Sequence, residues 1–178
     1  MANIRIWLGH LGAYNSGYLI GRWVDLPKDN EEMQEIYDEL MSQAARKGEH
    51  GDEFDVFDLE VNIHGVYKDL SRLGLRELND LAQRLEEMKD YEVEALSLVM
   101  QVLDTVPEAI QAIDEGKCLI LSDVENLEDL GRRHVEEFNS LEIPEALEFY
   151  INYEAYGRQL DLTGWTVLHE AKAAVFID

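Results

Sequence analysis

Acidic residues dominate the chain, and apolar residues lie between them at helical spacing. The 178 residues include 38 Asp and Glu against 15 Lys and Arg, which gives a formal net charge of −23. Hydrophobic residues still make up 46% of the chain, which is enough to form a core. A fold that buries the apolar positions must therefore hold the carboxylates on its surface at fixed mutual distances, unlike a solvated tail.

The negative charge is unevenly distributed. Residues 1–27 carry one acid and sum to +1, whereas residues 104–148 carry thirteen acids and three basic residues, a net charge of −10. This sign excludes simple binding to a phosphate backbone, which needs a basic surface. It permits the reverse, attraction of this chain to a basic groove on another protein. Acidity that serves solubility alone is the other explanation.

Residues 1–61 are expected to form a small β-sheet with one helix. The strands are expected over residues 3–8, 18–26 and 54–61, from alternation and from β-branched and aromatic residues. The segment 11–17 is rich in residues that favour turns. A helix should begin after Pro27 and end at Lys47–Gly48, because apolar residues recur between them at steps of three and four.

The rest of the chain mixes short helices with a second small sheet. Helices are expected within residues 65–115, 125–139 and 144–160, and strands over 117–121, 166–168 and 174–177. Boundaries near residues 62 and 105 separate these elements into groups. We therefore predict an α+β fold, an elongated chain of three small subdomains. These are a small β-sheet with a helix in residues 1–61, a helical bundle in 62–105, and a small β-sheet with helices in 106–178.

The sequence offers no motif for a metal site or a catalytic centre. The histidines lack His-x3-His spacing, and we expect isolated surface or capping roles for His10, His50, His64, His134 and His169. We expect no metal, no cofactor and no enzymatic activity. An enzyme of unknown class stays an alternative, because a carboxylate pair of the glycosidase type could be present among so many acids.

Several features favour a cytoplasmic location. Cys118 is the only cysteine, which fits a reducing compartment. The chain has no apolar run of 18 or more residues, and its N-terminus lacks the basic and then apolar pattern of a signal peptide. We therefore expect a cytoplasmic protein with no membrane partner.

Four aromatic residues recur at helical spacing after the acidic region, namely Phe149, Tyr150, Tyr153 and Tyr156. The surrounding acids would repel nucleic acid, which disfavours a base-stacking platform. Because a region this small cannot bury all four side chains, we predict that they form the interface of a homodimer within residues 106–178. Packing in the core of the chain itself is the alternative.

Acids spaced at i, i+3 or i+4 and i+7 on a helix follow one another at steps of about 5–6 Å, similar to the steps between phosphates of one DNA strand. Such positions define a candidate acidic surface. It comprises Glu31, Glu35, Asp38, Glu39, Asp80, Glu86, Glu87, Asp114, Glu115, Asp123, Glu125, Glu128, Asp129, Glu136, Glu137, Glu142, Glu145 and Glu148. For any single helix, an ordinary solvated face is the alternative explanation.

Two blocks of the sequence resemble the ArdA antirestriction proteins. Residues 11–26 read LGAYNSGYLIGRWVDL, and residues 127–162 read LEDLGRRHVEEFNSLEIPEALEFYINYEAYGRQLDL. The matching positions of the first block are Ala13, Tyr14, Asn15, Gly17, Gly21, Trp23, Asp25 and Leu26. Those of the second are Glu136, Glu137, Ile143, Pro144, Glu145, Tyr150, Tyr153, Glu154, Gly157 and Arg158. Between the blocks, Asp58 and Glu60 match an acidic segment of the family, but Leu59 replaces its aromatic residue.

The resemblance implies an elongated, curved homodimer whose surface acids imitate the phosphates of bent B-form DNA. It implies inhibition of type I restriction–modification enzymes by occupation of the groove on their DNA-binding subunit. Proteins of this family are carried on mobile genetic elements. Duplex DNA has about one charge per 1.7 Å, so a net charge of −23 matches roughly 40 Å of duplex. An acidic module that binds a basic partner unrelated to DNA is the alternative function.

Overall fold

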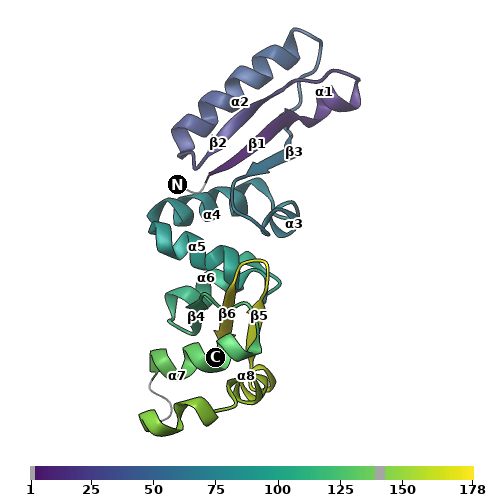
Figure 1. The fold of residues 1–178 in the computed structure, drawn as a ribbon. Helices are drawn as coiled ribbons and strands as arrows, with labels where there is room; N and C mark the ends of the chain where they lie inside the picture. The colour runs from purple at the N-terminus through teal and green to yellow at the C-terminus, as the bar shows by residue number, and fades with distance from the viewer. Residues whose placement is uncertain (1–2, 139–142) are drawn as a thin grey trace. The chain divides into compact units, whose positions relative to one another are not determined.

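The computed structural model describes residues 3–138 and 143–178, and the chain divides into two compact units (Figure 1). Unit 1 comprises Met1–Val93 and unit 2 comprises Glu94–Asp178. Each unit contains a three-stranded antiparallel sheet together with helices, which confirms the expected α+β fold. The division into three subdomains and their elongated arrangement stay predictions.

The sheet of unit 1 has the order β2-β1-β3, so its first strand is central. The strands are β1 (Ile4–His10), β2 (Gly21–Leu26) and β3 (Phe54–Val61), which confirms the three expected strands. The helices are α1 (Leu11–Asn15), α2 (Asn30–Ala45), α3 (Tyr67–Leu70), α4 (Leu75–Glu87) and α5 (Asp90–Val99), of which α5 continues into unit 2. Figure 1 shows α2 lying along the sheet.

Alternation along β1 decides which face of this sheet is buried. The buried side chains of β1 and of the inner side of α2 include Ile4, Ile6, Leu8, Ile36 and Leu40. The odd-numbered residues of β1 point to the opposite face, where the rings of Trp7 and Trp23 meet edge to face with 5.7 Å between their centroids. The helix α2 therefore covers one face and leaves its own outer side to solvent.

A side-chain amide attaches α4 to the first sheet and its helix. The backbone amide of Lys28 donates to Asn79 Oδ1 at 2.7 Å, and Asn79 Nδ2 donates to the carbonyl of Lys28 at 3.0 Å. These two hydrogen bonds satisfy both the backbone N–H and the backbone C=O of Lys28, a loop residue next to α2. Residues 75–87 therefore belong to the same compact unit as the N-terminal sheet.

Unit 2 is built around the sheet β4-β6-β5, whose strands are β4 (Cys118–Ser122), β5 (Trp165–Leu168) and β6 (Ala173–Ile177). The helices are α6 (Val106–Asp114), α7 (Leu127–Phe138) and α8 (Tyr153–Leu162), with the 3₁₀ helix η1 at Glu145–Tyr150. The core side chains come from strand, loop and helix, namely Leu121, Val124, Leu130, Leu160, Trp165 and Ala174.

Two glycines let the backbones of α7 and α8 touch. A Cβ at Gly131 would collide with the carbonyl oxygen of Tyr153, and a Cβ at Gly157 would collide with the carbonyl oxygen of Leu127. Each glycine faces the backbone of the other helix, so a side chain at either position would push the two helices apart. This close approach fixes the position of α7, which carries part of the candidate acidic surface.

One local expectation was incomplete and one was wrong. The segment 11–17 contains the short helix α1, because the buried His10 side chain caps it by accepting a hydrogen bond from the amide of Ala13 at 3.1 Å. The single helix expected over 144–160 is two elements, η1 and α8. Ile151 is extended, and Asn152 starts α8 by accepting a hydrogen bond from the amide of Ala155 at 2.9 Å.

We expect the substitution Gly157→Ala to lower the free energy of unfolding by about 3 kcal/mol, because the added methyl group overpacks a backbone contact. Gly51→Ala is the matched control, since its Cβ would meet only the His10 ring at an ordinary distance of 3.7 Å. Denaturant unfolding of both variants measures the difference. Equal stability of the Gly157→Ala variant and the parent chain would contradict the proposed helix contact.

Candidate functional site

No Asp or Glu side chain that the structure describes is buried. Within residues 3–138 and 143–178, His10 is the one polar or charged residue in the buried set. The acids also outnumber the basic residues. If each Lys and Arg paired with one acid, 23 carboxylates would still lack a cationic partner. The surface therefore carries a large excess of hydrated negative charge.

The outer side of α2 holds an uninterrupted row of acids. Its acidic residues are all exposed, and the helix itself contains no Lys or Arg; they are Glu31, Glu32, Glu35, Asp38 and Glu39. At about 1.5 Å per residue, the row spans about 12 Å, or about one carboxylate per 3 Å of helix axis. The apolar residues of α2 point to the sheet, which leaves this side to the acids.

Two acids of this row are partly neutralised by neighbours. Glu39 pairs with Arg22 of β2 at 2.6 Å, and Glu32 pairs with Lys28 at 2.8 Å. The hydrogen bond from Lys28 is the main reason that the pKa of Glu32 lies below its usual value. Glu31 and Glu35 have no basic partner within the described residues, and Asp38 accepts a hydrogen bond from the Gln34 amide at 2.9 Å. Glu31, Glu35 and Asp38 are thus the acids of the row that no described cation pairs with.

The acids of α7 are interrupted by a basic turn. Glu128 pairs with Arg132 at 3.1 Å and Glu136 pairs with Arg133 at 3.5 Å, so the helix has a net charge of only −2. Asp129 accepts a hydrogen bond from the amide of Glu125 at 3.1 Å and fixes the turn before the helix. This part of the candidate surface is a mixed-charge face, unlike the row on α2.

Further candidate acids of unit 2 are also engaged by cations. Lys172 donates to Glu125 at 2.6 Å, and Lys117 pairs with Glu115. These hydrogen bonds are the main causes that hold the pKa of Glu125 and of Glu115 below the usual value. The remaining described candidates are exposed, namely Asp80 (3.9 Å from Arg76), Glu86, Glu87, Asp114, Asp123, Glu137 and Glu148. Glu142 and the side chain of Glu145 lie outside what the structure describes.

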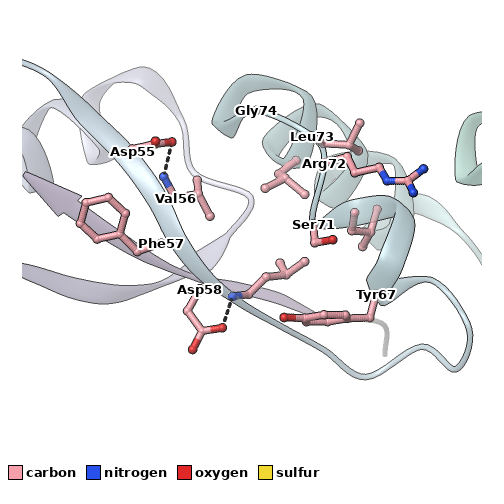
Figure 2. Close-up of a pocket in the computed structure, with 12 residues that line it drawn as sticks. Asp55, Val56, Phe57, Asp58, Tyr67, Ser71, Arg72, Leu73 and Gly74 are labelled. Carbon is pink, nitrogen blue, oxygen red and sulfur yellow. Dashed lines mark hydrogen bonds between the residues drawn. The ribbon is translucent and has the colours of Figure 1, made fainter. Parts of the chain in front are cut away.

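A shallow pocket of about 370 Å³ runs along β3, one of the two edge strands of the first sheet. Figure 2 shows Tyr67, Ser71 and Arg72 across from the strand, with Asp55 and Asp58 on it. The carboxylate of Asp55 accepts from the amide of Val56, and that of Asp58 accepts from the amide of Leu59, each at 2.8 Å (Figure 2). These bonds occupy edge amides and so disfavour pairing with a further strand.

Comparison with protein families identifies the class of molecule. A family model described as antirestriction protein (ArdA) matches residues 6–172 of the 178-residue chain. The chain belongs to the ArdA antirestriction family. The match includes both sequence blocks, 11–26 and 127–162, and membership implies antirestriction of type I restriction–modification enzymes. No curated protein matched the chain.

The four aromatic residues expected at an ArdA dimer interface lie in two different environments. Phe149 and Tyr150 of η1 are 95% and 83% exposed. Tyr153 is buried under Arg132, whose guanidinium lies 4.4 Å from its ring centroid. Tyr156 packs against the core of unit 2 and its hydroxyl lies 3.2 Å from His134 Nδ1. The expected stripe therefore leaves two side chains free to meet a partner.

None of the helices in residues 3–138 and 143–178 has the length and apolar character needed to cross a bilayer. Within the same residues, no group of three His, Cys, Asp or Glu side chains is arranged to hold a metal ion. Sequence reasoning missed the aromatic surroundings of His134, because Phe138, Tyr156 and Trp165 reach it from different elements.

We expect unit 2 to lose stability as the pH falls below about 6.5, because burial lowers the pKa of His134 from its usual 6.5. Above that pH the imidazole is neutral in both states; below it, the unfolded chain binds a proton that the folded chain resists. Thermal unfolding between about pH 7.5 and 5.5 measures the loss, and the loss should shrink in a His134→Gln variant. An identical pH dependence in both proteins would contradict this role for His134.

Proposed function

We propose that the chain is a DNA-mimicking antirestriction protein that blocks type I restriction–modification enzymes by occupying their DNA-binding groove. It acts in the cytoplasm without a catalytic step, and it serves a mobile genetic element that enters a new host. Family membership supports the target class. The exposed acid row on α2 is the observation that supports mimicry as the mode of action.

The spacing on α2 is comparable with that of a phosphate strand. The five acids follow one another at about one per 3 Å of axis, against about one phosphate per 3.4 Å along each DNA strand. The three acids of the row without a basic partner, Glu31, Glu35 and Asp38, still follow at about 5 Å. A groove lined with Lys and Arg would therefore meet carboxylates at an axial spacing similar to that of the phosphates on one strand of its DNA ligand.

The mechanism we propose is competition for cations. Acids held on a folded helix lose little conformational entropy on binding, so the mimic can bind tightly. The eighteen candidate acids and Glu32 would share the contacts, with the α2 row most important and the mixed-charge face of α7 secondary. In the free protein the same charges repel one another. Salt should therefore stabilise the isolated fold while it weakens the complex.

We expect charge to act collectively. Glu137→Gln alone should leave inhibition almost unchanged, because one exposed ion pair contributes about 0–1 kcal/mol. A combined variant with Glu31, Glu35, Glu86 and Glu87 changed to Gln and Asp38 to Asn should abolish inhibition and reduce the salt dependence of binding. Cleavage assays and binding titrations between about 0.05 and 0.3 M salt measure both effects.

The matched control for this variant carries Asp at the four Glu positions and retains Asp38, so that every charge is kept. It should inhibit as the parent chain does. Full inhibition by the neutralised variant, or an affinity of the parent chain that does not fall with salt, would contradict the charge mechanism. A large loss from Glu137→Gln alone would indicate a conventional single hot spot instead.

We also propose a homodimer in which the exposed rings of η1 pack against a second copy. Replacing Phe149 and Tyr150 by Ser should convert the dimer to a monomer at micromolar concentration, because the described residues cover almost none of these two rings. Tyr67→Ser, a change of an exposed ring in unit 1, is the control and should remain dimeric. Sedimentation velocity measures the state, and a monomeric parent chain would refute the dimer.

A further inference from the structure

The turn between β1 and β2 presents three large hydrophobic side chains in the least acidic part of the chain. Tyr14, Tyr18 and Leu19 are 55%, 41% and 71% exposed. Residues 11–23, which include all three, contain no Asp or Glu. Charge mimicry makes no use of such a segment, although it is one of the two blocks that mark the family. We call these three side chains the N-terminal tip.

Hydrogen bonds at its base and across the turn hold the tip in one conformation. At its base the imidazole of His10 is fully buried, accepts from the amide of Ala13 at 3.1 Å and reaches the carbonyl of Gly51 at 2.9 Å. The amide of Tyr18 donates to the carbonyl of Ala13 at 2.8 Å and closes the turn. Gly17 between them has a φ of +85°, which suits glycine. A preorganised tip loses little entropy when it binds.

A basic side chain lies beside Tyr18 of the tip, whereas α2 itself contains no Lys or Arg. The ammonium of Lys47 lies 5.6 Å from the centre of the Tyr18 ring, and Arg46 precedes it at the end of α2. The acids of residues 49–53 belong to the segment at the base of the tip, where Glu49 lies near Gly12 and the carbonyl of Glu53 accepts from the amide of Leu11 at 2.9 Å. A basic DNA groove would repel Lys47. The tip therefore fits an apolar surface that has a carboxylate within reach of Lys47.

We propose that the N-terminal tip is an uncharged anchor that docks on an apolar, weakly acidic surface of the same restriction–modification enzyme, beside its DNA groove. This inference rests on the proposed function. A polyanion alone would bind any protein with a basic groove, whereas a rigid aromatic anchor adds contacts that discriminate between such proteins. Because apolar contacts release no counterions, the anchor strengthens binding equally at low and high salt.

The test compares two double variants of the full chain that each remove an exposed Tyr and an exposed Leu. The tip variant is Tyr18→Ser with Leu19→Ser, and the control is Tyr91→Ser with Leu119→Ser. Binding to a type I restriction–modification enzyme that the parent chain inhibits is measured between about 0.05 and 0.3 M salt. We expect the tip variant to bind at least tenfold more weakly at every salt concentration, with an unchanged salt slope, and the control to stay within twofold.

Each of the following outcomes would contradict the proposal that the tip is an anchor. If the tip variant unfolds at the same temperature as the parent chain and binds the enzyme with the same affinity, the tip does not contact the enzyme. If the tip variant no longer self-associates, the tip is a contact between two copies of the chain. If the parent chain binds a DNA duplex directly and the tip variant does not, the tip is a nucleic-acid site. A parent chain whose affinity ignores salt would instead refute the charge mimicry on which the anchor rests.

Discussion

The hydration of carboxylates is the constraint on which the structure depends. An ionised carboxylate is very costly to bury without a partner, so a chain with 38 acids must keep them on its surface and build its core mainly from apolar residues. Among the described residues, the buried set is apolar except for His10. On α2 the inward positions are taken by residues such as Ile36 and Leu40, and the acids are left to align on the outer side. The order of the charges is thus a consequence of how the helix must be buried.

The same principle gives different surfaces on α2 and α7. On α2 no basic residue interrupts the row, and its partners Arg22 and Lys28 come from outside the helix. On α7 the basic residues Arg132 and Arg133 are part of the helix, and Arg132 also covers the ring of Tyr153. The charged side of α7, in the block 127–162, therefore combines surface charge with packing on an aromatic ring, whereas the charged side of α2 carries acids without a basic residue of its own.

Elements governed by local pattern could be predicted, and those governed by contacts across the chain could not. Alternation predicted β1, and apolar spacing predicted α2, because one buried face decides each. The break before Asn152 was missed, since the aromatic spacing and Pro144 matched a single helix. The family followed from two sequence blocks. Ion pairs such as Lys172 with Glu125, 47 positions apart, depend on tertiary placement that no local pattern encodes.

The central claim is that rigidly held carboxylates take the place of DNA phosphates in one groove. A competition assay measures this directly: a labelled duplex bound to a type I restriction–modification enzyme is titrated with the chain, and the displaced duplex is recorded. The account predicts full displacement at concentrations comparable with those of unlabelled duplex, with a midpoint that rises with salt. An inhibited enzyme that still held its duplex at saturating concentrations of the chain would contradict it.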